Sequence, residues 1–279
     1  MGAQESSQSL MAFRSGIDMI VVDYKSPFDL NHFLMSVVKH QPEVPWTLHV
    51  GLVEPDQDDH DIYERFRELP DLKGRIDLHV FSENIGYARA VNRLTQRCVR
   101  ETIGIFNADT RLKENVANEC HYALHSNPEW GVLGPRQVDD EGRVTAAGIF
   151  GSNDRPKDRA FHHRNSEEYA DIRDDAVTVS GSAYFVKASV WDELTDCPVY
   201  RKSNPAAQGA FLPTPLYYEE TFCSYHAREH GHKVVYYGPA TMVHRWRKAP
   251  RKTGSDALRV QMARQMFRRA CDEHGIEHD

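Results

Sequence analysis

Carboxylate and amide side chains directly follow four short apolar stretches of the chain. Asp23-Tyr24-Lys25 follows the first, Glu54 the second, Glu83-Asn84-Ile85-Gly86 the third and Asn107-Ala108-Asp109 the fourth. If these stretches are parallel strands, their carboxyl ends meet at the edge of the sheet where open α/β folds bind ligands. Taken singly, each of these residues is more typical of a turn. Their common placement favours a nucleotide site, with one acid for the ribose or base and another for a metal.

Asp109 is the sharpest of these candidates. It follows the apolar run 103–106, and an acid there must be solvated, paired or bound to a metal. Mg²⁺ and Mn²⁺ bind oxygen ligands and neutralise the charge of a diphosphate. The simpler interpretation is an acid in a turn or at a helix cap. The pattern predicts a divalent-cation site at Asp109.

Alternating strands and helices in the first half of the chain would position these residues. The apolar periodicity predicts strands at 17–22, 46–53, 75–81, 102–106 and 130–133, and helices at 27–40, 59–69, 87–100 and 115–126. Such alternation implies right-handed crossovers. We therefore expect an α/β fold with a Rossmann-like, mixed but mainly parallel sheet flanked by helices.

The second half is less regular. We expect strands at 144–150, 177–179, 183–186 and 233–237, mobile loops at 151–175 and 197–215, and helices from 189 and at 219–230. A C-terminal helix should begin at a cap on Ser255 and end near Cys271. Its predicted apolar face consists of Leu258, Met262, Met266 and Phe267.

Composition is typical of a folded globular protein and excludes a disordered or collagen-like chain. The chain has 279 residues, with 34 Lys and Arg against 41 Asp and Glu, a net charge of −7. No apolar run approaches the roughly 18 residues of a membrane span. The polar N-terminus lacks a leader pattern, and the five cysteines are widely spaced without a C-x-x-C pair. These features predict a cytoplasmic, reducing location.

Charge is distributed unevenly. Residues 245–270 contain nine basic residues and one acid, a net charge of +8, so the rest of the chain carries −15. This stretch could contact an anionic membrane surface or nucleic acid, although a solvated helix packed beside the sheet is the simpler interpretation. We expect a flexible tail at 1–16, one main domain at 17–253 and a basic amphipathic helix at 254–279.

Five short motifs follow one another in order. They are Glu83-Asn84-x-Gly86-Tyr87-Ala88-x-Ala90-x-Asn92, Asn107-Ala108-Asp109-Thr110, Ser180-Gly181-Ser182-Ala183, Tyr218-Glu219-Glu220 and Thr241-Met242-Val243-His244. Together they resemble the family 2 glycosyltransferases of GT-A fold, especially the rhamnosyltransferase-like branch, across residues 17–244.

The resemblance implies an inverting glycosyltransferase that moves a hexosyl or deoxyhexosyl group from a nucleotide-diphosphate donor, of UDP or dTDP type, to an acceptor hydroxyl. It implies Mn²⁺ or Mg²⁺ held by Asp109 and His244, and a general base at Glu220 or its neighbour Glu219. The donor residues that it implies, together with Arg245 by position, are Asp23, Tyr24, Glu54, Asn84, Gly86, Asn92, Asn107 and Asp109. Ser180, Gly181 and Ser182 would line the sugar or acceptor pocket.

Two positions depart from the family pattern. The family usually reads Glu-Asp-x-Asp where this chain has Glu219-Glu220 and then Phe222, which leaves open which glutamate is the base. Asn107 stands where the metal motif often has its first acid. The chemistry needs a base for the acceptor hydroxyl and a cation for the leaving diphosphate. The simpler interpretations are that the two glutamates stabilise a helix N-terminus and that His244 ends a strand.

Two other functions remain as alternatives. His226-Ala227-Arg228-Glu229-His230 matches the H-x-x-E-H zinc-peptidase signature, with Glu273 or Glu277 as a further ligand. A non-catalytic module that binds nucleotide sugars or glycans is the second. A nucleotidyltransferase would need a glycine-rich phosphate loop, which the sequence lacks. The acceptor stays open among a glycan, a lipid-linked sugar, a protein side chain and a modified DNA base.

Overall fold

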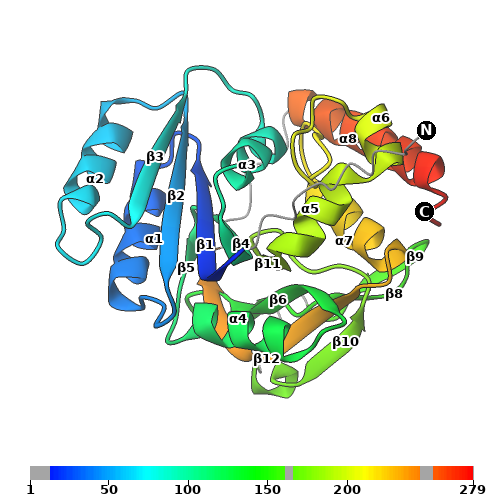
Figure 1. Cartoon of the computed structure of the whole chain (residues 1–279), viewed down its shortest axis with the longest axis horizontal. Coiled ribbons are helices and arrows are strands. Elements are labelled where there is room, and N and C mark those ends of the chain that lie inside the picture. Colours follow the sequence, from blue (N-terminus) through cyan, green and yellow to red (C-terminus); the bar gives the residue numbers. More distant parts are fainter. Residues whose placement is uncertain (1–12, 161–165, 246–253, 279) are drawn as a thin grey trace, which may run out of the picture.

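A ten-stranded mixed sheet forms the centre of the computed structural model, which describes residues 13–160, 166–245 and 254–278 (Figure 1). Its strands are β1 (Arg14–Asp23), β2 (Trp46–Val53), β3 (Ile76–Phe81), β4 (Arg100–Asn107), β5 (Thr110–Arg111), β6 (Trp130–Val138), β7 (Val144–Ala146), β10 (Ile172–Ala176), β11 (Ala183–Lys187) and β12 (Lys233–His244). The longest helices are α1 (Pro27–Lys39), α2 (Gln57–Arg67), α3 (Tyr87–Thr95), α4 (Val116–Ser126), α5 (Ala188–Asp196), α7 (Glu219–Glu229) and α8 (Gly254–His274).

The order in which successive strands are added to the sheet reverses beside β1. Along the main path the order is β10-β12-β6-β11-β4-β1-β2-β3, with β3, β2, β1 and β4 mutually parallel. β11 runs antiparallel to both β4 and β6. Because β2 and β3 add on one side of β1 while β4 adds on the other, a crevice opens at the carboxyl ends of β1 and β4. The predicted fold class, a mainly parallel α/β sheet flanked by helices with a C-terminal helix, is confirmed.

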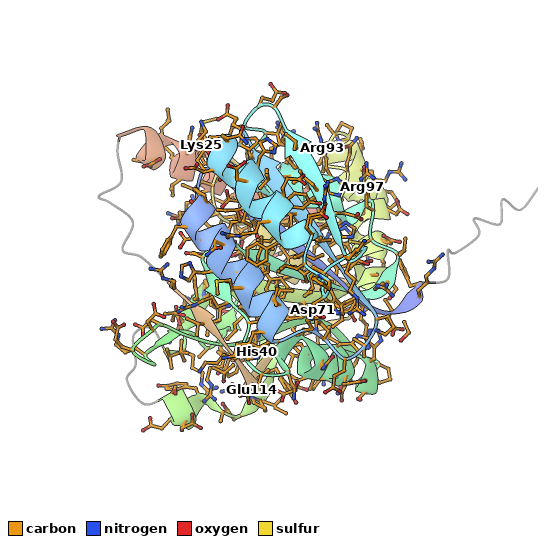
Figure 2. The ribbon with its side chains drawn as sticks, turned by 90° about the vertical axis from the view of Figure 1, so that its left-hand side faces the viewer. Lys25, His40, Asp71, Arg93, Arg97 and Glu114 are labelled. Atoms are coloured by element: carbon orange, nitrogen blue, oxygen red, sulfur yellow. The ribbon has the colours of Figure 1, made fainter. Side chains whose placement is uncertain are left out.

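Two layers of helices cover the sheet. Helices α1, α2 and α4 bury residues such as Phe33, Phe66 and Leu124 against one face, and α3, α5 and α7 cover the other. Figure 2 shows α1 and α2 side by side, with Lys25 near the start of α1 and His40 at its end. The buried strand residues are largely Val, Ile and Leu, which suit strands covered on both faces.

The predicted mobile loop at 151–175 is wrong in its described part. β8 (Ile149–Ser152) pairs with β9 (Arg155–Asp158), a 3₁₀ turn follows at Ser166–Tyr169, and β10 joins the sheet beside β12. Its polar sequence suits an exposed hairpin and an edge strand, and aromatic–arginine contacts hold it. Arg159, for example, lies 5.1 Å from the ring of Tyr169. The predicted strand at 177–179 contributes only an isolated bridge, and the predicted loop at 197–215 contains α6 (Pro198–Ser203).

Helix α8 packs through a face that shares only Phe267 with the fully buried part of the predicted one. Ala263, Phe267, Ala270 and Cys271 are buried against α6 and α7, whereas Leu258 and Met262 are 58% and 47% exposed. The helix begins at Gly254, so Ser255 lies within it rather than at its cap. Residues 1–12 of the predicted tail and residues 246–253 of the basic stretch lie outside the described residues. In the part of the chain that is described, no helix combines the length and apolarity needed to cross a bilayer.

Candidate active site

A cavity of about 540 Å³ opens at the crevice between the ends of β1 and β4. Most of the sequence-predicted site residues line it together, although they come from segments far apart in the chain. These are Asp23, Tyr24, Asn107, Asp109, Ser180, Gly181, Ser182, Glu219, Glu220 and His244. An adjoining cavity of about 550 Å³ shares Tyr24 and Tyr87 with it and adds Asn84 and Gly86. Together they give room for a nucleotide-sized ligand.

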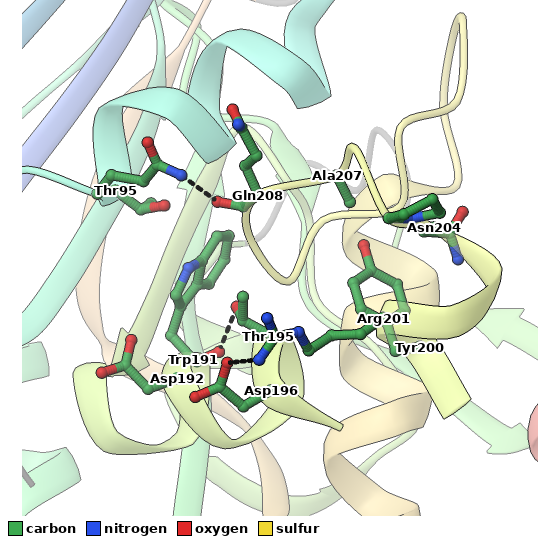
Figure 3. Close-up of a pocket in the computed structure, with 12 residues that line it drawn as sticks. Thr95, Trp191, Asp192, Thr195, Asp196, Tyr200, Arg201, Asn204, Ala207 and Gln208 are labelled. Atoms are coloured by element: carbon green, nitrogen blue, oxygen red, sulfur yellow. Dashed lines mark hydrogen bonds and ion pairs between the residues drawn. The ribbon is translucent and has the colours of Figure 1, made fainter. Parts of the chain in front are cut away.

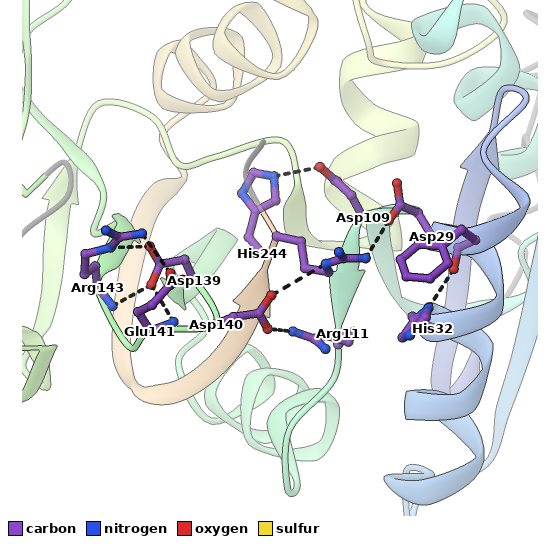
Figure 4. A network of polar contacts seen from close by, with 11 residues as sticks. Asp29, His32, Asp109, Arg111, Asp139, Asp140, Glu141, Arg143 and His244 are labelled. Atoms are coloured by element: carbon purple, nitrogen blue, oxygen red, sulfur yellow. Dashed lines mark hydrogen bonds and ion pairs between the residues drawn. The ribbon is translucent and has the colours of Figure 1, made fainter. Parts of the chain in front are cut away.

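Asp109 and His244 face each other across the first cavity (Figure 4). The Ser182 hydroxyl donates to Gln137 Oε1 at 2.6 Å, so its oxygen accepts from Nδ1 of His244 at 3.3 Å. The other ring nitrogen, Nε2, then carries the lone pair and lies 3.5 Å from Asp109 Oδ2. Two electron-pair donors at this separation fit a divalent cation between them, with Ser182 fixing the imidazole tautomer. The residues present therefore fit a Mn²⁺ or Mg²⁺ ion.

Arg245 is held by carboxylates beside this pair. Its guanidinium lies 3.1 Å from Asp29 Oδ1 and 3.5 Å from Asp140 Oδ2, and it stacks over the ring of Phe28. Asp140 also pairs with Arg111 (Figure 4). Arg245, one of the predicted donor-binding residues, thus lies in a network of carboxylates that positions its positive charge. The sequence analysis missed Asp29, which also lines the cavity, because an acid in the first turn of a helix is ordinary.

Glu219 and Glu220 occupy the first turn of α7, after Tyr218 in the left-handed conformation at φ 71°. Gly181 lies against Glu220, since an added Cβ there would be 3.0 Å from Glu220 Cγ. The Thr214 hydroxyl donates to the carbonyl of Tyr217 at 2.7 Å and lies 3.4 Å from Glu219 Oε2. Burial and the neighbouring charge of Glu220 raise the pKa of Glu219 to about 8, and burial raises the pKa of Glu220. Raised carboxyl pKa values are typical of groups that exchange protons near neutral pH.

Tyr87 was not predicted as a site residue. It is the first residue of α3, and its hydroxyl is buried without a hydrogen-bond partner among the described residues. Burial raises the pKa of Tyr87 well above its usual value, and the charges of Glu219, Glu220 and Asp109 add to that effect. The hydroxyl is therefore a neutral donor directed into the acidic part of the site.

A second buried carboxyl, which was not predicted as a site residue, lies beside Asp23. Asp59 caps α2 reciprocally with Asp56, and its side chain contacts Asp23. Burial raises the pKa of Asp23 to about 7, with a further contribution from Asp59, and Ser26 N–H partly offsets this by donating at 3.2 Å. Two carboxyls this close share a proton at neutral pH.

The stability of the Asp23→Asn variant relative to the wild type should increase as the pH rises. The raised folded-state pKa means that the native state keeps a proton which the unfolded chain loses above about pH 4, so the wild type loses stability between about pH 4 and pH 7. The stability of Asp23→Asn relative to the wild type should grow by on the order of 3 kcal/mol from pH 4 to pH 8. Denaturant unfolding at each pH measures this. Asp58→Asn, an exposed acid on α2, is the control, and a difference that does not change with pH would contradict the shared proton.

Three of the predicted donor residues, Asn92, Glu54 and Arg245, do not line either cavity. Asn92 is fully buried on α3, where its amide donates to the carbonyls of Ala207 and Phe211 and accepts from Phe211 N–H. It holds the loop before α7 in place. Glu54 pairs with Lys25 at 3.4 Å.

The second cavity extends the site towards the C-terminal helix. Asn84 accepts from Gly86 N–H at 3.0 Å, and Gly86 has φ 84°, a conformation that suits glycine at the start of α3. Arg259, Met262 and Met266 of α8 line the opposite wall. The described basic residues of α8 thus include one that faces the candidate ligand site.

A third cavity, of about 310 Å³, lies between α5, α6 and the loop that follows α6 (Figure 3). Its polar groups bond to one another. Arg201 pairs with Asp196, Thr195 donates to the carbonyl of Trp191, and Gln96 donates to the carbonyl of Gln208. None of the residues predicted to carry chemistry lines this cavity, so the crevice between β1 and β4 remains the candidate site.

Comparison with solved structures shows the same fold in known enzymes. A mannosyltransferase from Pyrobaculum calidifontis, solved in complex with GDP-Man and Mn²⁺, matches with a TM-score of 0.62 and 15% identity over 93% of this chain. GalNAc-T7 with UDP, GalNAc and Mn²⁺ matches with a TM-score of 0.65 and 11% identity over 92%, and S. aureus TarS 1–349 with 0.56 and 13% over 81%. This chain spans 65%, 48% and 59% of those three chains, respectively.

The sequence itself gives the family. No curated protein sequence matches the chain. The model of the family described as glycosyltransferase like family 2 matches residues 15–268, nearly the whole length. Among the described residues, the side chain that joins His226 and His230 in a metal-ligand group is Cys197, and neither Glu273 nor Glu277, the ligands expected for the peptidase alternative, belongs to it. The match does not separate the branches of the family, so the rhamnosyltransferase-like assignment stays a prediction. The chain belongs to glycosyltransferase family 2 and has the GT-A fold.

Proposed function

We propose that this chain is a metal-dependent, inverting glycosyltransferase that moves a hexosyl or deoxyhexosyl group from a UDP- or dTDP-linked donor to an acceptor hydroxyl. One observation carries the proposal. The Asp109–His244 pair and the Glu219–Glu220 pair lie around the same cavity at the crevice of the sheet. A metal pair and a base pair are the two groups that such a transfer requires.

Each group has a definite task. Asp109 and His244 would hold Mn²⁺ or Mg²⁺, and Mn²⁺ is favoured because an imidazole nitrogen is a softer ligand than oxygen. The ion would neutralise charge on the leaving diphosphate. Arg245, fixed by Asp29 and Asp140, adds positive charge beside it. Glu220 accepts the proton of the acceptor hydroxyl. The acceptor oxygen then attacks the anomeric carbon from the side opposite the diphosphate, which leaves, and the anomeric centre is inverted.

Glu220 is the better candidate for the base. Gly181 leaves space directly beside its side chain. Neutral Tyr87 can donate to a sugar or phosphate oxygen nearby. The half-exposed ring of Tyr24, shared by both cavities, offers a surface for a nucleobase. The solved structures of the same fold carry GDP-Man in one case and UDP with GalNAc in another, so nucleotides with different bases bind this fold.

The binding step can be tested by thermal unfolding. UDP and dTDP should each raise Tm in the presence of Mn²⁺ by about 2–4 °C at a concentration far above Kd, and by much less without metal. GDP tests the alternative donor class. Turnover of the matching nucleotide sugar then separates an enzyme from a non-catalytic binding module. If no nucleoside diphosphate stabilises the chain with Mn²⁺ or Mg²⁺, the proposed donor site is wrong.

A further inference from the structure

Three histidines and a cysteine gather at the far side of α7 from the candidate active site. Cys197 lies at the junction of α5 and α6, His226 and His230 lie one turn apart on α7, and His274 ends α8. One donor atom each of Cys197, His226 and His230 lie within 4.8 Å of one another. The His226 and His274 rings are 4.5 Å apart between centroids. Figure 1 shows the four helices converging in this region.

The buried histidine at the centre of this cluster lacks protein partners. His226 is 1% exposed, and neither of its ring nitrogens has a hydrogen-bond partner among the described residues. Nε2 of His274 is also buried without a hydrogen-bond partner among the described residues. Burial, reinforced by the neighbouring His274 and His230, lowers the pKa of His226 to about 3. Burying polar nitrogens without partners is unfavourable, so a ligand that takes up their lone pairs would relieve this cost.

His230 is already oriented for metal binding. Glu193 accepts from its Nδ1 at 2.9 Å, which leaves Nε2 as the free donor of the ring. The same carboxylate bonds to His232 at 2.8 Å, so it is held from two sides. A carboxylate that fixes the tautomer of a histidine is the usual outer partner of a zinc ligand.

The other groups of metal-ligand side chains among the described residues have polar partners close to their histidines. In Glu101–His121–His125, the Thr102 hydroxyl bonds to both rings at 2.8 Å. In Asp18–His49–Cys98, the ring nitrogens of His49 also lack hydrogen-bond partners, but they lie 3.6 Å and 3.8 Å from carboxylate oxygens of Asp18 and Asp77. The cluster around His226 differs because, among the described residues, neither a hydroxyl hydrogen bond nor a carboxylate ion pair reaches its central ring.

We propose that Cys197, His226, His230 and His274 bind one Zn²⁺ ion. Nitrogen and sulfur donors select zinc over the Mg²⁺ or Mn²⁺ of the active site. Tetrahedral zinc holds its donors about 3.3–3.8 Å apart, so Cys197, His226 and His230 need only close in by about 1 Å. The His274 ring already lies beside that of His226. The Cys197 thiol releases its proton to solvent when the sulfur binds the metal. Four protein ligands leave no position for water, so this is a structural site rather than the centre of a peptidase.

The site would join two helices that line the candidate site to the α5–α6 junction. α7 begins with Glu219 and Glu220, and α8 carries Arg259, Met262 and Met266 into the second cavity. Zinc would fasten the C-terminal half of α7 to the C-terminal end of α8 and to the α5–α6 junction. The ion would stabilise the native state in proportion to its occupancy without contacting the reacting groups.

The test uses the full chain, stripped with a chelator and titrated with Zn²⁺, with Co²⁺ as a spectroscopic probe. We expect one tightly held zinc per chain, a rise in Tm of about 5 °C or more, and a thiolate-to-cobalt charge-transfer band, which the oxygen and nitrogen ligands of the active site cannot give. Cys197→Ser should abolish the band and weaken zinc binding at least about 100-fold. Cys98→Ser, the matched thiol control, should retain both.

His230→Gln keeps the proposal testable if Cys197→Ser fails to fold. Its amide can still bond to Glu193 and the position is partly exposed, so the metal-free variant should fold and lose tight zinc binding. His232→Gln changes a histidine on the same carboxylate outside the cluster and should bind zinc normally. The proposal is overturned if the wild type holds no stoichiometric zinc, if the cobalt band persists in Cys197→Ser, or if His230→Gln and His232→Gln bind zinc alike.

Discussion

Glu220→Gln should lower kcat for sugar transfer by about 10³-fold while donor binding stays nearly unchanged. The glutamine keeps the shape of the side chain and its place in the first turn of α7 but cannot take a proton from an acceptor hydroxyl. General-base catalysis contributes about 10²–10⁴-fold to such reactions. Transfer rates at saturating donor measure the effect, and the Tm rise with nucleotide and Mn²⁺ shows that the site is intact.

Glu219→Gln is the matched control for this result. Both glutamates line the same cavity, but Gly181 packs against Glu220. Substitution of Glu219 should reduce kcat by no more than about tenfold, because it leaves the proton acceptor in place. Equal losses in the two variants would mean that the pair acts as one unit, and full activity of Glu220→Gln would exclude it as the base.

The pH dependence of the transfer rate is a second test of Glu220 as the general base. A base must be ionised, and burial raises the pKa values of this pair above the usual range for carboxyl groups. The transfer rate of the wild type should therefore rise with pH over a range above that of an ordinary carboxyl group and then level off. Residual transfer by Glu220→Gln should lose most of this rise.

Local sequence patterns predicted the parts of the structure that depend on burial and turns. Apolar runs placed β2 at Trp46–Val53 without error and the other central strands within a few residues. Residues such as Asp23 and Asp109 were brought together because parallel strands end at one edge of a sheet. The order of short motifs added the distant Glu219, Glu220 and His244.

Partners supplied by distant segments could not be read from the sequence. Asn92 belongs to a family motif, yet its amide bonds to a loop more than a hundred residues away. Asp59 reads as a helix cap, and only the packing of α2 beside β1 brings it to Asp23. The apolar side chains Leu258 and Met262 of α8 suited a buried face, but the helix rests on its alanines and Phe267 instead. Such contacts depend on tertiary geometry, which a periodic pattern does not encode.

Asp109→Ala should lower kcat/KM by about 10²–10⁴-fold in the presence of Mn²⁺. The change removes the only carboxylate within ion-pair distance of His244 among the described residues. Without it the ion binds weakly, and the leaving diphosphate keeps its charge. Transfer assays across a Mn²⁺ titration, together with the Tm rise caused by nucleotide, measure both consequences. Asp140→Asn, which alters the same polar network at an acid outside the cavity lining, should cost no more than about fivefold.

The metal titration distinguishes a lost ligand from a damaged fold. If Asp109 binds the ion, Asp109→Ala should need a much higher Mn²⁺ concentration for half-maximal activity, and excess Mn²⁺ should restore part of the rate, because His244 and the diphosphate still offer donors. A variant that merely misfolds would respond to no concentration of metal. Chelation of the wild type should reproduce the loss and reverse fully on adding Mn²⁺. Activity of Asp109→Ala that equals the wild type at low Mn²⁺ would show that the cation, if the reaction uses one, is held elsewhere.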